Sequence, residues 1–145
     1  MRQAVHRITL CLLGALCLAS PSLAQDLDDI LQAKLRPGWR MAKGTHMAAL
    51  QLDLASGWKT YWRQPGDSGL APHFDFSQSE GVQTVEVVYP TPEVSWLWNS
   101  RNIGYDTQVI FPLRLSVDDT AGITLIGRIE IGVCRELCIP ITLDL

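Results

Sequence analysis

The clearest indication of the fold of this 145-residue chain is the segment Gln108-Val109-Ile110-Phe111-Pro112-Leu113-Arg114-Leu115-Ser116-Val117. Its odd-numbered positions are all apolar, and its even-numbered positions are mostly polar. A period of two is typical of a β-strand with one buried face, because successive side chains of a strand point to opposite sides of the sheet. The stretch therefore predicts a strand that covers a hydrophobic core.

The same alternation, or a short apolar run between turn residues, recurs on both sides of this stretch. It predicts further strands at 31–35, 47–54, 58–63, 73–76, 82–89, 125–133 and 139–145. Clusters of Pro, Gly, Asp and Ser at 65–69, 90–92 and 118–122 predict loops, and the segment between Pro92 and Tyr105 is also expected to be a loop. Seven or eight short strands without a convincing helix indicate an all-β fold, an antiparallel β-sandwich of immunoglobulin-like type.

Composition sets limits on domain number and on partners. The chain has 47% hydrophobic and 19% charged residues, which is typical of one globular domain. It carries 12 Lys and Arg against 15 Asp and Glu, a net charge of −3. This balance leaves no surplus of cations to bind a phosphate backbone, so nucleic acid is excluded as an expected partner.

The amino terminus has the pattern of a secretory signal. Arg2 and Arg7 precede an apolar run at 8–19, and Ser22-Leu23-Ala24 forms a small-residue cleavage site. We expect a signal peptide at 1–24, cleavage after Ala24 and a mature domain at 25–145, located in the periplasm. The apolar run is shorter than the roughly 20 residues that cross a bilayer, and no later apolar stretch comes near that length, so no membrane span is expected in the mature chain.

Removal of the signal leaves only Cys134 and Cys138 of the four cysteines. An oxidising compartment favours a disulfide between them. The bridge would close a loop of about five residues, which stabilises a fold by only about 2 kcal/mol in the chain-entropy estimate. Close spacing suits a pair that opens and closes, because one sulfur can resolve a mixed disulfide formed by the other.

Three interpretations of the cysteine pair therefore stay open from spacing: a redox-active disulfide, a structural crosslink and a metal site. A zinc site needs four ligands, so His46 and His73 would have to approach the pair from distant strands. Arg135 next to Cys134 favours a thiolate, and Glu136 opposes it.

Two aromatic segments are candidates for a binding surface. Alternation places Trp58, Thr60 and Trp62 on one face of a strand, with Lys59, Tyr61 and Arg63 on the other face. The tryptophans then suit the core, whereas Tyr61 and Asp67 are free to serve a site.

The second aromatic segment is Trp96-Leu97-Trp98 in the expected loop after Pro92. Large apolar side chains in a loop either pack back onto the core or form a binding surface. Gly104 at the end of this loop is a candidate hinge.

Four segments resemble one known family when taken together and in order: GWKTYWRQPGDSGLAP at 57–72, YPTPEV at 89–94, GYDTQVIFPL at 104–113 and GVCRELCIP at 132–140. They are similar to the amino-terminal periplasmic domain of the DsbD and ScsB thiol:disulfide interchange proteins, over about residues 28–145. The resemblance implies an immunoglobulin-like sandwich that exchanges electrons with thioredoxin-fold periplasmic proteins, which serve as donor and acceptor, without a cofactor or a metal. It implies that Cys134 and Cys138 are the catalytic pair, that Cys138 forms the mixed disulfides, and that Trp96, Leu97 and Trp98 lie in a cap loop over the cysteines.

The sequence departs from the family pattern in its Cys-x3-Cys spacing, which is shorter than in the best-known members. It contains neither a membrane region nor a thioredoxin-like domain, so it is either a free-standing relative or part of a longer chain. We expect a monomer with a protein-disulfide reductase type of activity. The alternative from another class is a secreted β-sandwich that binds a protein partner and whose disulfide is purely structural.

Overall fold

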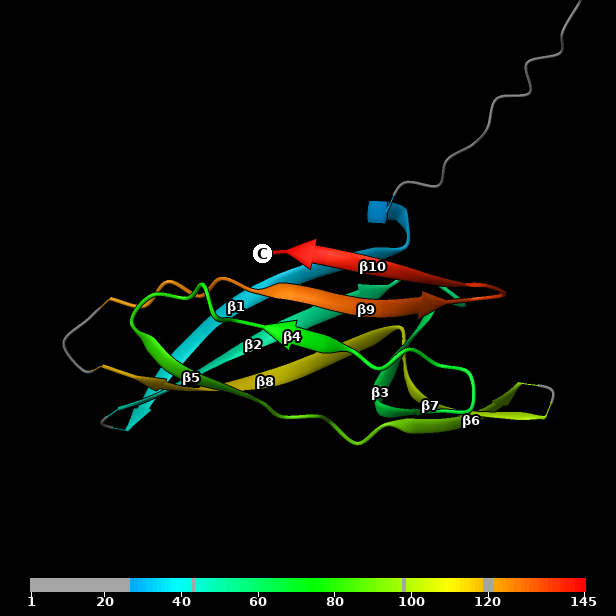
Figure 1. Cartoon of the computed structure of the whole chain (residues 1–145), viewed down its shortest axis with the longest axis horizontal. Coiled ribbons are helices and arrows are strands. Elements are labelled where there is room, and N and C mark those ends of the chain that lie inside the picture. Colours follow the sequence, from blue (N-terminus) through cyan, green and yellow to red (C-terminus); the bar gives the residue numbers. More distant parts are fainter. Residues whose placement is uncertain (1–26, 43, 98, 119–121) are drawn as a thin grey trace, which may run out of the picture.

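A computed structural model describes residues 27–42, 44–97, 99–118 and 122–145 of the chain (Figure 1). A short 3-10 helix, η1 (Leu27–Asp29), precedes the strands. The strands are β1 (Leu31–Ala42), β2 (Thr45–Leu54), β3 (Lys59–Gly66), β4 (His73–Asp75), β5 (Val82–Val87), β6 (Glu93–Leu97), β7 (Ser100–Asp106), β8 (Gln108–Val117), β9 (Arg128–Cys134) and β10 (Cys138–Asp144). The expected cleavage site after Ala24 lies outside the described residues.

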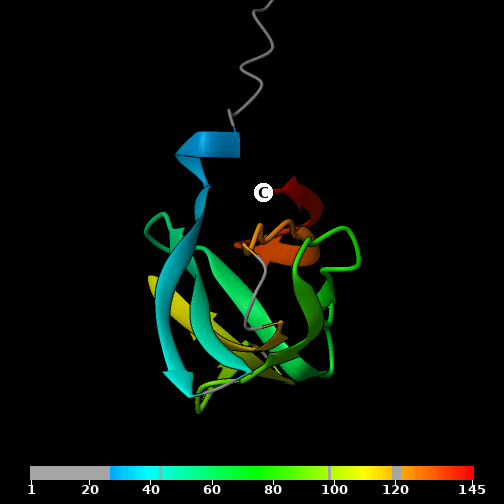
Figure 2. The same ribbon diagram turned by 90° about the vertical axis from the view of Figure 1, so that its left-hand side faces the viewer.

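The strands form two antiparallel sheets. The first sheet has the order β1-β2-β8-β5, and the second has the order β10-β9-β3-β7-β6, with β4 paired to β9 beside it. Seen end-on in Figure 2, the two layers face each other across the interior. The expected antiparallel β-sandwich is confirmed.

The core lies between the sheets, and β8 supplies its centre. The inward residues Val109, Phe111, Leu113, Leu115 and Val117 are all buried, as their alternation predicts. The second sheet contributes Ile129, Ile131 and Val133 from β9. Burial of a large aliphatic or aromatic side chain stabilises a fold by about 1.5–3 kcal/mol, so this continuous cluster holds the two layers together.

Phe111 is also the centre of an aromatic group. Its ring makes edge-to-face contacts with Phe74, Tyr89 and Tyr105, at centroid distances of 5.4–5.6 Å. The Tyr105 hydroxyl donates a hydrogen bond of 2.9 Å to the Pro90 carbonyl oxygen. Burial raises the pKa of Tyr105 to about 12, so the hydroxyl stays protonated and keeps the segment before β6 in place.

The prediction of a loop between Pro92 and Tyr105 is wrong, because this segment forms the hairpin of β6 and β7. Trp96 pairs with Arg101 and Leu97 pairs with Ser100 next to the turn. Val94 and Trp96 are largely exposed, so the hairpin lacks the buried alternating face that reveals a strand in a sequence. Edge strands of this kind are stabilised by backbone pairing more than by burial.

Gly104 is not at a loop hinge but inside β7, opposite Tyr61. A Cβ atom at this position would approach the Thr60 carbonyl oxygen to 2.1 Å. Glycine therefore permits close contact between β3 and β7 here. The predicted loop at 65–69 is also partly replaced by strand, since β3 continues through Pro65 to Gly66 after a register shift.

Candidate redox site

The two cysteines face each other at one end of the second sheet. β9 ends at Cys134, β10 begins at Cys138, and the two residues are direct partners in the antiparallel ladder. A disulfide joins them, with their Cα atoms 4.1 Å apart. The hairpin turn between them consists of Arg135, Glu136 and Leu137. In Figure 1 this turn lies at the right-hand end of the molecule, the same end as strands β6 and β7.

The two sulfur-bearing residues differ in access to solvent. Cys134 is only 5% exposed, whereas Cys138 is exposed. Leu137 beside Cys138 is 79% exposed, and Ile139 on its other side is also exposed. An apolar, accessible border therefore surrounds Cys138, and an incoming thiolate reaches this sulfur more readily than that of Cys134.

Tyr61 of β3 contacts the exposed cysteine. Its hydroxyl oxygen lies 3.8 Å from Cys138 Sγ. A disulfide sulfur carries no hydrogen, so the tyrosine hydroxyl is the donor in this contact. Burial raises the pKa of Tyr61, which keeps the hydroxyl protonated and able to donate over the physiological pH range.

The site lies on the outer face of the second sheet. Trp58 belongs to the core between the sheets and Trp62 packs against it, whereas Tyr61 and Cys134 are buried outside that core. Successive side chains of a strand alternate between faces, so Lys59 and Tyr61 of β3 share the outer face with Cys134 of β9. The alternation expected for residues 58–63 agrees with this arrangement.

The loop after β3 covers part of this outer face. Gly69 lies so close to Tyr61 that an added Cβ would approach the ring carbon Cδ1 to 2.4 Å. Leu70 packs over Gly132, where an added Cβ would approach the Leu70 Cβ to 2.6 Å. Gly69 thus allows the loop to pack closely against Tyr61, and Gly132 allows Leu70 of the loop to pack against β9, the strand that ends in Cys134.

Asp67, expected to serve a binding surface, fastens this loop to β7. Its backbone N–H donates to the Arg101 carbonyl oxygen at 2.8 Å, and its carboxylate accepts from the Arg101 backbone N–H at 2.8 Å. Ser68 donates a hydrogen bond of 2.9 Å to the amide oxygen of the buried Asn102. The two hydrogen bonds of Asp67 connect it with Arg101 of β7, and neither of them involves a cysteine.

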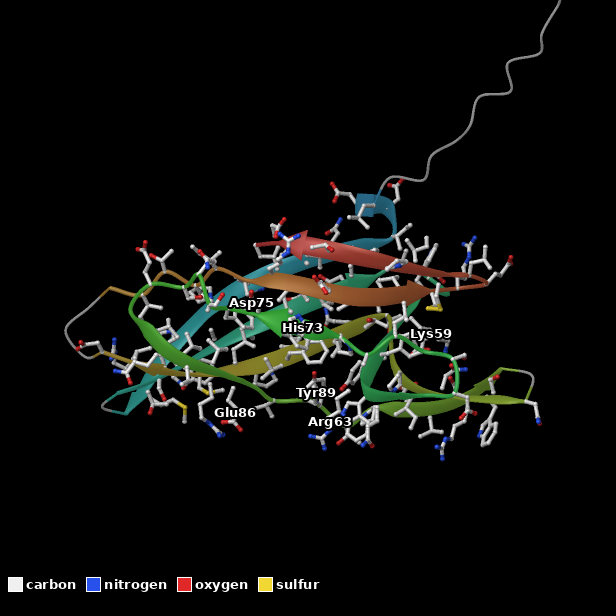
Figure 3. All side chains as sticks on the ribbon, in the orientation of Figure 1. Lys59, Arg63, His73, Asp75, Glu86 and Tyr89 are labelled. Carbon is white, nitrogen blue, oxygen red and sulfur yellow. A yellow bond between two sulfur atoms is a disulfide. The ribbon has the colours of Figure 1, made fainter. Side chains whose placement is uncertain are left out.

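The hairpin turn of the cysteines is also anchored through Arg135. Its guanidinium carbon lies 5.3 Å from the centre of the Trp58 ring, within the range of a cation–π interaction. Arg135 also donates its backbone N–H to the Leu137 carbonyl oxygen. Arg63 makes a second cation–π contact, with the Trp62 ring, and its guanidinium group also lies near the Tyr89 ring. Figure 3 labels Arg63 and Tyr89 and shows both away from the cysteines.

Of the expected cap residues, Trp96 and Leu97 lie at the end of β6, next to the turn of the β6–β7 hairpin. Trp96 is 66% exposed. Trp98 lies outside the described residues, and so does the side chain of Leu97. A cap formed by these three residues therefore stays a prediction.

The two histidines considered as metal ligands lie apart from the cysteine pair. His46 is in β2 of the first sheet, where it contacts the Pro37 carbonyl oxygen. His73 begins β4 and pairs with Glu130 of β9 (Figure 3). Across the described ranges, no group of three or more His, Cys, Asp or Glu residues is placed to hold a metal ion.

Sequence reasoning did not single out Lys59, Gly69 or Gly132 as parts of the site. The alternation placed Lys59 on the face of Tyr61, but the proximity of Cys134 depends on the pairing of β3 with β9. The glycines carry no chemical group that marks them in a sequence. Their signal is spatial, because each leaves room for a neighbouring side chain.

A family model described as "Thiol:disulfide interchange protein DsbD, N-terminal" matches residues 28–145. The structure is similar to the crystal structure of the N-terminal periplasmic domain of ScsB from Proteus mirabilis, with a TM-score of 0.67 and 30% sequence identity. The match covers 83% of this chain and 47% of that chain, so the present chain spans about half of its relative. None of the curated proteins matches the chain. Within the described segments, no helix is long and apolar enough to cross a membrane.

Proposed function

Because the chain belongs to the family of the N-terminal domain of the thiol:disulfide interchange protein DsbD, we propose that it is a periplasmic module that exchanges electrons with thioredoxin-fold proteins through Cys134 and Cys138. The observation that carries the proposal is the unequal burial of the two bonded cysteines. One accessible sulfur accepts the attack, and the protected one leaves and later resolves. Residues 1–24 are the signal that delivers the domain at 25–145 to the periplasm.

Reduction of the domain begins at Cys138. A thiolate of the reduced donor attacks Cys138 Sγ, the bond to Cys134 breaks, and its electron pair leaves on Cys134 as a thiolate. The second thiol of the donor loses its proton and attacks the donor sulfur of the mixed disulfide, which releases Cys138 as a thiolate. The donor is oxidised to a disulfide, and the domain gains two electrons.

Delivery of these electrons reverses the order of events. The Cys138 thiolate attacks a disulfide of the acceptor and forms a mixed disulfide, and one acceptor thiolate leaves. Cys134 then attacks Cys138 Sγ, restores the internal disulfide and expels the second acceptor sulfur as a thiolate. The Tyr61 hydroxyl, 3.8 Å from Cys138 Sγ, donates to this sulfur whenever it carries negative charge.

Trapping of the mixed disulfide tests this function. The Cys134→Ser variant is incubated with a thioredoxin that keeps only its attacking cysteine, activated as a mixed disulfide with thionitrobenzoate, and covalent complexes are quantified by mass spectrometry after non-reducing electrophoresis. We expect Cys138 to expel thionitrobenzoate and form a complex that persists, because neither partner then holds a second thiol that could resolve it. The matched Cys138→Ser variant should form far less complex, because Cys134 is only 5% exposed.

Each contrary outcome has a definite meaning. Formation of the complex only by Cys138→Ser would reverse the roles of the two cysteines. Failure of both variants, with intact folds by circular dichroism, would refute exchange with thioredoxin-fold proteins and favour a structural disulfide.

A further inference from the structure

Lys59 lies between Cys134 on one neighbouring strand and Asp106 on the other. It lies on β3, which the strand order places between β9 and β7. Its direct partner on β9 is Cys134, and its direct partner on β7 is Asp106. Directly opposite residues in antiparallel strands have Cβ atoms about 4.5–5.5 Å apart, so a lysine side chain reaches either neighbour.

Lys59 and Cys134 share a face of the sheet. The neighbouring residues Thr60 of β3 and Val133 of β9 are buried, and Val133 belongs to the core between the layers. Lys59 directly precedes Thr60, and Cys134 directly follows Val133. Because successive side chains of a strand point to opposite faces, Lys59 and Cys134 both project from the outer face of the sheet. Figure 3 shows Lys59 at the same end of the molecule as the sulfur–sulfur bond.

With the disulfide closed, the lysine is paired with the acid. Lys59 Nζ lies 3.3 Å from Asp106 Oδ2, and each side chain is 42% exposed. Ion pairs exposed to this degree contribute little stability and exchange partners readily. A closed disulfide is neutral, so it does not compete with Asp106 for the ammonium group.

Reduction changes the charge next to Lys59. Cys134 is 5% exposed, and a thiolate in so buried a position is costly unless a cation lies close to it. Arg135, the neighbouring cation in the turn, stacks on Trp58, which belongs to the core on the opposite face of the sheet. Glu136 in the turn is exposed and disfavours the thiolate, and Tyr61 contacts the other sulfur.

We propose that Lys59 is the electrostatic partner of the Cys134 thiolate, paired with Asp106 while the disulfide is closed and with Cys134 once it opens. The inference rests on the proposed function and assigns to Lys59 the stabilisation of the leaving group. When a donor thiolate bonds to Cys138, the electron pair of the broken bond goes to Cys134, and the ammonium group stabilises that charge. A leaving thiol of lower pKa departs faster, so the lysine accelerates opening of the disulfide.

The test isolates the Cys134 thiol from exchange chemistry. Cys138→Ser leaves Cys134 as the cysteine to be titrated in the mature domain, and its ionisation is followed by the far-ultraviolet absorbance of the thiolate against pH. We expect Lys59→Met in this background to raise the pKa of Cys134 by about half a unit or more, since the partner charge is lost but is partly screened by solvent. Asp106→Asn should shift it in the opposite direction, because the lysine is released from its competitor.

Two further variants separate charge from structure. Lys59→Arg should restore most of the Cys134 ionisation, because the charge is kept. Lys34→Met removes an exposed lysine from β1 of the other sheet and should leave the titration unchanged. Thermal unfolding of each variant verifies that the fold is intact.

The outcomes distinguish this inference from the function on which it rests. An unchanged Cys134 titration in folded Lys59→Met overturns the inference, even if the wild-type domain exchanges disulfides with thioredoxin. A shifted titration, with restoration by arginine, supports it. The exchange assay on the wild-type domain separately decides the proposed function.

Discussion

The absence of a side chain at position 69 lets the loop after β3 rest on the tyrosine that contacts Cys138. A methyl group there would approach Tyr61 Cδ1 to 2.4 Å and Pro65 Cβ to 2.6 Å. Overpacking of this kind costs about 1–3 kcal/mol, because the ring or the loop must move. We therefore expect Gly69→Ala to lower the free energy of unfolding by about that amount and to slow attack of a small thiol on the disulfide.

Gly122→Ala is the matched control for this prediction, because an added Cβ there meets no atom of the described residues within 4 Å. Urea denaturation measures stability, and the rate of reduction by a monothiol measures reactivity. Equal stability and equal reduction rates for the two alanine variants would show that Gly69 does not position Tyr61.

At the level of single residues, the sequence predicts on which face of its strand a side chain lies. It predicts less well which residues of other strands are next to that side chain. Alternation correctly separated Tyr61 from Trp58 and Trp62. It could not place Cys134 beside Lys59 or Leu70 on Gly132, because these contacts join residues more than 60 positions apart along the chain. Register between distant strands depends on the whole sheet and not on any local pattern.

At the level of elements, the β6–β7 hairpin differs most from the sequence prediction. Its apolar residues Val94 and Trp96 point largely to solvent, so its strands show no buried period of two. Backbone pairing with β3 through β7 defines it instead. An exposed tryptophan on such a hairpin, at the end of the molecule that bears the cysteine turn, suits contact with a partner and not stabilisation of the fold (Figure 1).

Trp96 and Trp58 differ in burial, so we expect them to differ in their contribution to stability. Trp96→Ala should change the free energy of unfolding by less than about 0.5 kcal/mol, because this residue is 66% exposed. Trp58→Ala should lower it by about 3–5 kcal/mol, because Trp58 is 5% exposed and its ring also contacts Arg135. Chemical denaturation of both variants gives the comparison. A large loss of stability for Trp96→Ala would place its ring in a packed environment and contradict the exposed hairpin.

At the level of the whole molecule, the core and the disulfide are separate. The continuous core of the described residues includes neither cysteine, and it is formed largely by β2, β8 and β9. A short loop of this kind also contributes only about 2 kcal/mol to stability. We therefore expect the domain to keep its fold when the disulfide opens, as the proposed exchange requires.

The sandwich itself was predictable from the spacing of short alternating strands. The order of strands within each sheet was not, because it depends on pairings such as that of β2 with β8 and of β3 with β9. That order brings the cysteine turn, Tyr61 and Lys59 to one face, and no local motif contains this information.

The reduction potential of the Cys134–Cys138 pair decides whether this disulfide is redox-active or structural. The folded domain is equilibrated with glutathione buffers of known potential, and the fraction of free thiol is measured by alkylation and mass spectrometry. The exposed Cys138, with its short turn outside the core, predicts a potential above about −300 mV and full reversibility without unfolding. A potential well below about −300 mV, or reduction only after denaturation, would identify a structural crosslink and contradict thiol:disulfide exchange.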